Sequence, residues 1–386
     1  MSEAFNFIEN EEFAENAVIK VVGVGGGGGN MLNHMIEKGI KDIELICTNT
    51  DVQALKTNKA PIKIQLGKEL TKGLGAGMEP EVGKGAAEES YDDIKRALEG
   101  ADLVFISAGM GGGTGTGAAP VIAKIAKEIG ALTVGVITKP FRREGARRAK
   151  LAEIGFNELK NECDSIVTIL NQKLLSIIDR KASRAGAYKM VDDILFQAVG
   201  GISNMIVSFG ENDVNVDFAD LKKVMSHRGM ALMGIGHKSG ETSAVDALSQ
   251  AIESPLLDDT NISDARGLLI HFTINENYPL VDIDESMEEI LGELMDDENI
   301  DIIEGQTTNN NLADDEIIVT IIATGFDENK PANKVSSTND ATNNKTSNII
   351  NLNVLHQKAV GSEGYDDELL GSDYLDQPAY IRNRRD

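Results

Sequence analysis

Residues 109–117 read GMGGGTGTG, and this glycine- and threonine-rich stretch directly follows an apolar run, ADLVFISAG, at 101–109. Such a run before glycines predicts a buried strand, and the spacing of apolar residues over 115–130 predicts a helix. A strand, a glycine-rich loop and a helix N-terminus bring backbone N–H groups and the positive end of a helix dipole against a phosphate chain. The hydroxyls of Thr114 and Thr116 add further donors.

A second glycine-rich stretch, KVVGVGGGGGN, lies at 20–30. It matches the dinucleotide-binding pattern G-x-G-x-x-G at Gly23, Gly25 and Gly28. That pattern also requires an acid about 20 residues further on, at the end of the next strand. Here the next strand ends in CTNTD, and its acid, Asp51, lies three residues later than the pattern requires. The position of the acid therefore neither supports nor rules out dinucleotide binding.

A third stretch, GLGAGMEPEVGKG at 73–85, resembles a P-loop only superficially. Met78 stands where that motif needs its first glycine, and Gly85 follows Lys84 where it needs Ser or Thr. A phosphate chain would therefore be held mainly by backbone amides and helix ends. Because a nicotinamide cofactor needs one such loop, two at adjacent strand ends favour a longer polyphosphate.

The first half of the chain alternates strands with helices. The predicted strands are 17–25, 43–51, 101–109 and 132–140, and the predicted helices are 30–39 and 115–130. This alternation favours βαβ units and a mostly parallel sheet, whose ligands bind at the carboxyl ends of the strands.

A long helix is predicted next, over 182–207, because its apolar residues recur every three or four positions. The strands predicted after it are 230–238, 267–274 and 315–326, and the helices are 244–252 and an acidic one at 284–297. The fold class is therefore α/β: a Rossmann-like parallel-sheet domain joined by a long central helix to a smaller α/β domain, followed by a disordered tail.

Composition excludes several classes of protein. The formal net charge of −25, with no basic stripe in the first 320 residues, argues against nucleic-acid binding and against direct adsorption to an anionic membrane. Cys47 and Cys163 are expected to be buried, reduced thiols. The N-terminal residues lack the pattern of a signal peptide, so we expect a soluble cytoplasmic protein. The histidines show no ligand spacing, so no protein-ligated metal is predicted.

These motifs together resemble the tubulin-like GTPases, and in particular their bacterial cell-division branch. The resemblance rests on GGGTGTG after an apolar strand and on GGGGGN at the first strand–helix turn, and it covers about 17–326 plus the C-terminal peptide. It implies a tubulin-like GTPase fold, GTP and GDP as ligands, Mg²⁺ on the phosphates, and head-to-tail self-assembly into a ring at the division site. It also implies a cytoplasmic location beneath the inner membrane.

The resemblance also assigns residues to the nucleotide. Those implied for the phosphates and their surroundings are Gly26, Gly27, Gly28, Gly29, Asn30, Gly75, Ala76, Gly77, Gly111, Gly112, Gly113, Thr114, Gly115 and Thr116. Those implied for the ribose and guanine are Glu144, Arg148, Asn171, Tyr188 and Asp192. The chain departs from many relatives at Leu170, where Pro is usual, and at Tyr188, where Phe is common.

The motif NVDFAD at 215–220 contains Asp217 and Asp220, whose spacing puts both carboxylates on one side of a helical turn. The residues alone favour a helix N-terminus with Asp217 as its cap or a first-turn charge. The resemblance implies instead that Asn215, Asp217 and Asp220 are supplied to the nucleotide of a neighbouring subunit, where the carboxylates polarise the attacking water. Head-to-tail contacts of this kind do not close, and they generate filaments.

The chain thus divides into predicted parts. These are an N-terminal segment (1–16), a GTP-binding domain (17–181), the central helix (182–207), a C-terminal α/β domain (208–327), a linker (328–370) and a partner-binding peptide (371–386). The linker is Asn-, Thr-, Ser- and Lys-rich and lacks the apolar residues for a core. The peptide residues that resemble an adaptor-binding motif are Asp373, Tyr374, Leu375, Pro378, Ala379, Tyr380, Ile381 and Arg382. Contact with the membrane would then be indirect, through an adaptor.

Two other functions are compatible with parts of the sequence. One is an NAD(P)-dependent dehydrogenase built on the first glycine-rich stretch, which leaves GGGTGTG, NVDFAD and the tail unexplained. The other is a tubulin-like filament with another task, such as plasmid segregation or cell shape, against which the tail peptide argues.

Overall fold

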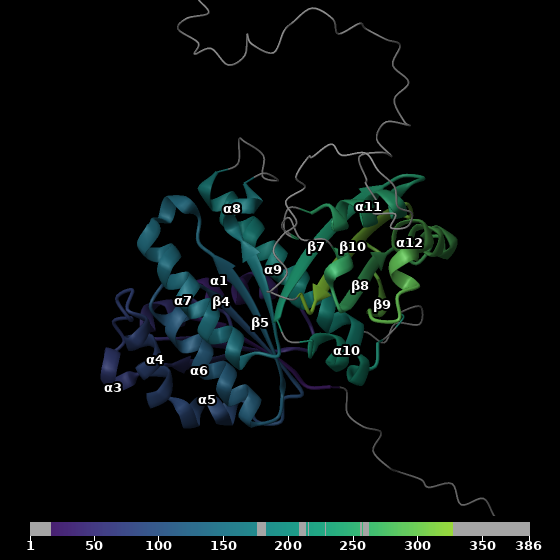
Figure 1. The fold of residues 1–386 in the computed structure, drawn as a ribbon. Helices are drawn as coiled ribbons and strands as arrows, with labels where there is room; N and C mark the ends of the chain where they lie inside the picture. The colour runs from purple at the N-terminus through teal and green to yellow at the C-terminus, as the bar shows by residue number, and fades with distance from the viewer. Residues whose placement is uncertain are drawn as a thin grey trace, which may run out of the picture. The chain divides into compact units, whose positions relative to one another are not determined.

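The computed structural model describes residues 17–175, 183–207, 214, 216–227, 229–254, 257 and 262–326 (Figure 1). The predicted N-terminal segment, the linker, the partner-binding peptide and Asn215 lie outside the described residues.

The described strands form one ten-stranded sheet with the order β3-β2-β1-β4-β5-β6-β7-β10-β8-β9. The strands are β1 (Ile19–Val24), β2 (Glu44–Asn49), β3 (Ile62–Gln65), β4 (Leu103–Gly109), β5 (Leu132–Lys139), β6 (Ser165–Leu170), β7 (Gly229–Ser239), β8 (Gly267–Ile274), β9 (Asp301–Thr308) and β10 (Glu316–Thr324). Strands β1 to β6 are parallel, as the alternation predicts. Strand β7 continues this parallel sheet beside β6, and β10 then runs antiparallel to both β7 and β8.

Helices cover both faces of the parallel strands (Figure 1). The helices of the described chain are α1 (Gly25–Glu37), α2 (Val52–Thr57), α3 (Lys68–Thr71), α4 (Pro80–Glu89), α5 (Tyr91–Leu98), α6 (Thr114–Glu128), α7 (Ala146–Glu162), α8 (Asn171–Leu174), α9 (Arg184–Val207), α10 (Phe218–Met225), α11 (Ser243–Ile252) and α12 (Leu280–Met295), of which the last three accompany the second half of the sheet. Phe105 of β4 packs in the core beneath α1 and α9, while the next residue, Ile106, packs in the core beneath α4 to α7. Burial on both faces explains why the strand is apolar throughout.

The acidic helix begins earlier than predicted, at Leu280, and ends at Met295. Strands β3, β6 and β9 and helices α2 to α5, α7 and α8 are not predicted from the sequence. Among the described helices, none combines the length and apolar character that a membrane span requires.

The first helix begins at Gly25 rather than at Asn30, so the five glycines form its first turns instead of a loop. The reason is close packing against β4. A Cβ on Gly28 would lie 2.2 Å from the carbonyl oxygen of Ser107, and one on Gly27 would lie 3.0 Å from the backbone of Gly109. A helix of larger residues could not approach the strand this closely.

This packing predicts opposite behaviour for two neighbouring glycines. We expect Gly28→Ala to lower the free energy of unfolding by about 1–3 kcal/mol or more, because the methyl group collides with backbone. Gly26→Ala is the matched control, since a Cβ there meets no atom within 4 Å. Urea unfolding of the nucleotide-free proteins measures both. Equal stability of the two variants would contradict the packing explanation.

Candidate nucleotide-binding site

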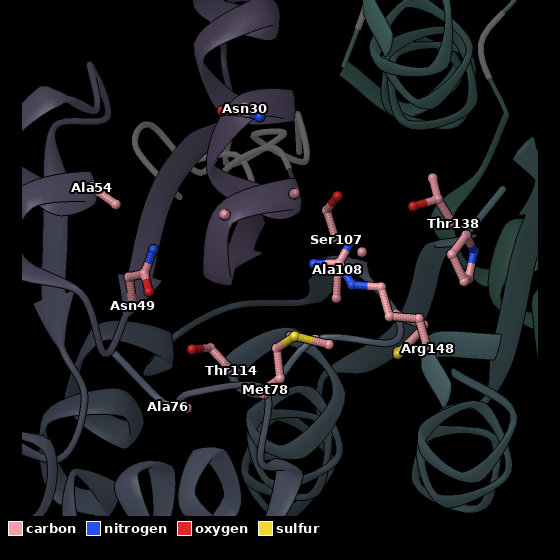
Figure 2. A pocket seen from close by; sticks show the side chains of 18 of the residues that line it. Asn30, Asn49, Ala54, Ala76, Met78, Ser107, Ala108, Thr114, Thr138 and Arg148 are labelled. Atoms are coloured by element: carbon pink, nitrogen blue, oxygen red, sulfur yellow. The ribbon is translucent and has the colours of Figure 1, made fainter. Parts of the chain in front are cut away.

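A pocket of about 470 Å³ opens at the carboxyl ends of the parallel strands (Figure 2). Its floor is formed by the ends of β2, β4 and β5, and its walls by the first turns of α1 and α6 and by one side of α9. The strand order reverses direction between β1 and β4, and open α/β sheets bind their ligands at such a switch point.

Two helix N-termini face the phosphate end of this pocket. Gly26 of α1 and Gly112, just before α6, line it, and a Cβ added to either would meet nothing within 4 Å. Bare backbone beside open space, at the positive ends of two helices, is suited to an anion such as a polyphosphate. The residues present therefore fit the phosphates of a nucleotide.

Four of the residues assigned to the nucleotide do not line the pocket. They are Gly28, Gly29, Gly111 and Thr116. The carbonyl of Gly29 accepts a hydrogen bond of 2.7 Å from Asn58 Nδ2. The backbone N–H of Gly111 donates to Thr116 Oγ1 over 2.9 Å, and Gly111 has φ +93°, which glycine adopts without strain. These four residues belong to the turns at the starts of α1 and α6. Other residues of the same two turns line the cavity.

The third glycine-rich stretch reaches the same pocket, where Gly75, Ala76 and Gly77 line it. The N–H of Gly75 donates to the Thr50 carbonyl over 3.3 Å, which ties this loop to the end of β2. Lys84 is exposed on α4 and does not line the pocket. The position of Lys84 outside the pocket agrees with the sequence analysis, in which the spacing around this lysine does not match a P-loop.

All five residues assigned to ribose and guanine also line the pocket: Glu144, Arg148, Asn171, Tyr188 and Asp192. Tyr188 is held edge-to-face against Phe141, with ring centroids 5.5 Å apart. Asn171 is 4% exposed, and its Oδ1 has no hydrogen-bond partner among the described residues. Burial raises the pKa of Asp192 to about 6. An unpartnered buried acceptor and a desolvated carboxyl in one pocket suit a base that carries hydrogen-bond donors.

The rest of the lining was assigned to the nucleotide neither by the motifs nor by the resemblance. These residues are Asn49, Thr50, Asp51, Ala54, Met78, Ser107, Ala108, Gly109, Met110, Thr138, Pro140, Val191 and Leu195. For Asn49, Thr50 and Asp51, the polar end of the strand, CTNTD, is a sequence signal that could have indicated a place in the pocket. Asp51, weighed as a ribose ligand, caps α2 by accepting from the N–H of Gln53 over 2.8 Å.

The aspartate pair lies apart from this pocket. Asp217 is the N-cap of α10 and accepts from the N–H of Ala219 over 3.0 Å, so the helix-cap prediction is confirmed. Asp217 and Asp220 are both exposed, and neither lines the pocket. At the other end of α10, His227 Nε2 lies 3.0 Å from Asp301 Oδ2 of β9, which helps to fix the helix on the sheet.

Within the described ranges, no three His, Cys, Asp or Glu side chains are placed to hold a metal ion.

Sequence comparison matches both halves of the chain to known families. Residues 18–179 match the GTPase domain of the Tubulin/FtsZ family, and residues 229–327 match the C-terminal domain of the FtsZ family. These ranges contain the parallel strands with the pocket and the strands β7 to β10, respectively.

Solved structures agree with these matches. An empty FtsZ dimer from M. jannaschii is 43% identical, with a TM-score of 0.75 over 81% of this chain and 89% of that chain. CetZ2 from Haloferax volcanii, solved as a GTPγS-bound protofilament, is 19% identical, with a TM-score of 0.68 over 81% of this chain and 94% of that one, and it supports the fold alone. Because the identity of 43% extends over most of both chains and both domain families match in order, the chain belongs to the FtsZ family of tubulin-like GTPases.

Proposed function

We propose that this polymerising GTPase hydrolyses GTP at head-to-tail contacts between subunits and forms the filaments of a cell-division ring. One observation carries the proposal: the nucleotide pocket and the exposed pair Asp217 and Asp220 occupy separate parts of the described chain. Within one subunit the carboxylates do not line the pocket, so a second subunit must bring them to it. A contact between two different surfaces repeats without closing and produces a filament.

Each region of the pocket has its own task in this proposal. The N–H groups at the starts of α1 and α6 hold the phosphates, and Asn171 and Asp192 accept hydrogen bonds from guanine while Tyr188 packs against it. Asp217 and Asp220 of the next subunit, with Asn215, orient and polarise the water that attacks the γ-phosphate. Phosphoryl transfer depends on positioning and charge placement, so a site completed only by assembly couples hydrolysis to filament formation.

Mg²⁺ bound to the phosphates belongs to this proposal and would neutralise charge that develops on them. The oxygen-bearing side chains at this end of the pocket, Thr50, Asp51 and Thr114, are of the type that this cation prefers. The hydroxyls of Thr50 and Thr114 lie 2.7 Å apart, which joins the end of β2 to the start of α6.

The cellular role follows from the family and the tail. We place the filament in the cytoplasm beneath the inner membrane, attached through adaptors that bind the C-terminal peptide. The match to the FtsZ C-terminal domain favours cell division over plasmid segregation or cell shape, and the family excludes a dehydrogenase.

Asp220→Ala tests the shared site. We expect GTP-dependent polymers in light scattering, with phosphate release about two orders of magnitude slower because a transition-state contact is lost. Glu293→Ala, an exposed acid on α12, is the control and should behave as wild type. Wild-type turnover in Asp220→Ala would disprove the shared-site mechanism.

The pH dependence of GTP binding tests Asp192. A carboxylate accepts from both guanine donors, whereas a neutral carboxyl keeps one acceptor oxygen and presents an O–H to the other donor, so affinity should fall by up to about tenfold per pH unit below a pH of about 6 and be constant above it. Calorimetric titration across pH 5 to 8 measures this. In Asp192→Asn the affinity should be lower at neutral pH, and the step near pH 6 should disappear. A step that persists in this variant would assign the titration to another group.

Removal of residues 371–386 tests the tail. The shortened protein should polymerise and hydrolyse GTP at wild-type rates in solution, because the pocket and the aspartate pair are retained. In cells it should fail to form a ring and to support division. Normal division by the shortened protein would refute the adaptor-binding role.

A further inference from the structure

Two buried side-chain oxygens without a hydrogen-bond partner among the described residues lie in the lining of the pocket. One is Asn171 Oδ1, already assigned to guanine, and the other is Ser107 Oγ. Buried polar atoms are nearly always paired, so an unpaired one in a binding pocket calls for a partner that arrives with the ligand.

Ser107 lies on the floor of the pocket, near the end of β4. The residue is 1% exposed and its Oγ is buried, and Figure 2 draws it between the labels of Asn30 of α1 and Thr138 of β5. Its carbonyl is the atom that Gly28 closely approaches, so the residue is fixed by the packing of α1 on the sheet.

The side chain of Ser107 points to the face of the sheet that α1 and α9 cover. Residues of one strand alternate between faces, and Phe105, two positions earlier, packs in the core beneath these two helices. On this side the pocket is lined by Val191, Asp192 and Leu195 of α9. Ser107 thus lies on the side of the pocket that α9 lines, and α9 carries Tyr188 and Asp192, which are assigned to the nucleoside. Gly112 and Thr114, which precede and begin α6, are assigned to the phosphates.

We propose that the hydroxyl of Ser107 hydrogen-bonds the nucleoside part of the bound guanine nucleotide, at the ribose or the base. This inference rests on the proposed binding of the nucleotide in this pocket. It adds a ligand residue that neither the motifs nor the resemblance indicated.

The proposal requires opposite effects on stability and on affinity. In the empty protein no hydrogen bond offsets the free-energy cost of removing this hydroxyl from water. Removal of the hydroxyl should therefore leave the free energy of unfolding unchanged or raise it. In the complex the same removal deletes a hydrogen bond, so the nucleotide binds more weakly. A residue with a purely structural role would change stability without this loss of affinity.

Ser165→Ala is the matched control. Ser165 is also 1% exposed and its Oγ also lacks a partner among the described residues, but it begins β6 and does not line the pocket. Both variants remove one buried hydroxyl from a parallel strand of the same sheet. They differ in that Ser107 lines the pocket and Ser165 does not.

The experiment compares wild type, Ser107→Ala and Ser165→Ala after removal of bound nucleotide. Thermal unfolding measures the stability of the empty proteins, and calorimetry measures the dissociation constants of GTP and GDP. We expect melting temperatures at or above wild type for both variants. Ser107→Ala should bind GTP and GDP about 3- to 10-fold more weakly, by the same factor for each. Ser165→Ala should bind both as wild type does.

Three results would overturn the inference. They are an unchanged affinity of Ser107→Ala for both nucleotides, a loss confined to GTP, which would direct the hydroxyl to the γ-phosphate, and a Ser107→Ala protein that is less stable than wild type or fails to fold. A wild-type protein that binds neither nucleotide would instead refute nucleotide binding itself. The two failures are therefore distinguishable.

Discussion

The close approach of α1 to β4 is the contact on which the rest of the site depends. Gly28 lies against the carbonyl of Ser107, and no other residue type fits there. This contact seats the first turn of α1 at the switch point of the sheet, beside the start of α6. Two positive helix ends then converge on one cavity, and a polyphosphate can be held largely by backbone.

The same arrangement separates the pocket from the aspartate pair, Asp217 and Asp220. The pocket needs only the parallel strands and the helices that cover them, and it is complete within one chain. The carboxylates proposed to activate water are at the start of α10, which is fixed on the second half of the sheet through Val224 and His227. The carbonyl of Val224 accepts from Thr324 Oγ1 over 2.9 Å. Under the proposed function, one chain binds the nucleotide, and hydrolysis requires the carboxylates of a second chain.

Local patterns predicted β1, β2, β4, β5 and the long helix, because in these elements apolar residues follow a regular pattern and glycines mark the strand ends. They failed at β3, β6 and β9. The strand β9, for example, reads DIIEGQTT and is half-buried, so it lacks the continuous apolar pattern of a central strand. The glycine run was also misread as a loop, since glycine alone does not indicate that a helix begins there.

The sequence by itself determined that the chain has a parallel α/β domain with phosphate-binding turns, because glycine spacing and strand hydrophobicity are local properties. Only the tertiary structure decided which way each residue faces. Gly26 and Gly112 face the cavity, whereas Gly28 and Gly111 face protein, although all four belong to the same motifs. The tertiary structure likewise determined that Ser107 lines the pocket. The physical reason is that direction depends on neighbours brought from distant parts of the chain, and no local spacing encodes them.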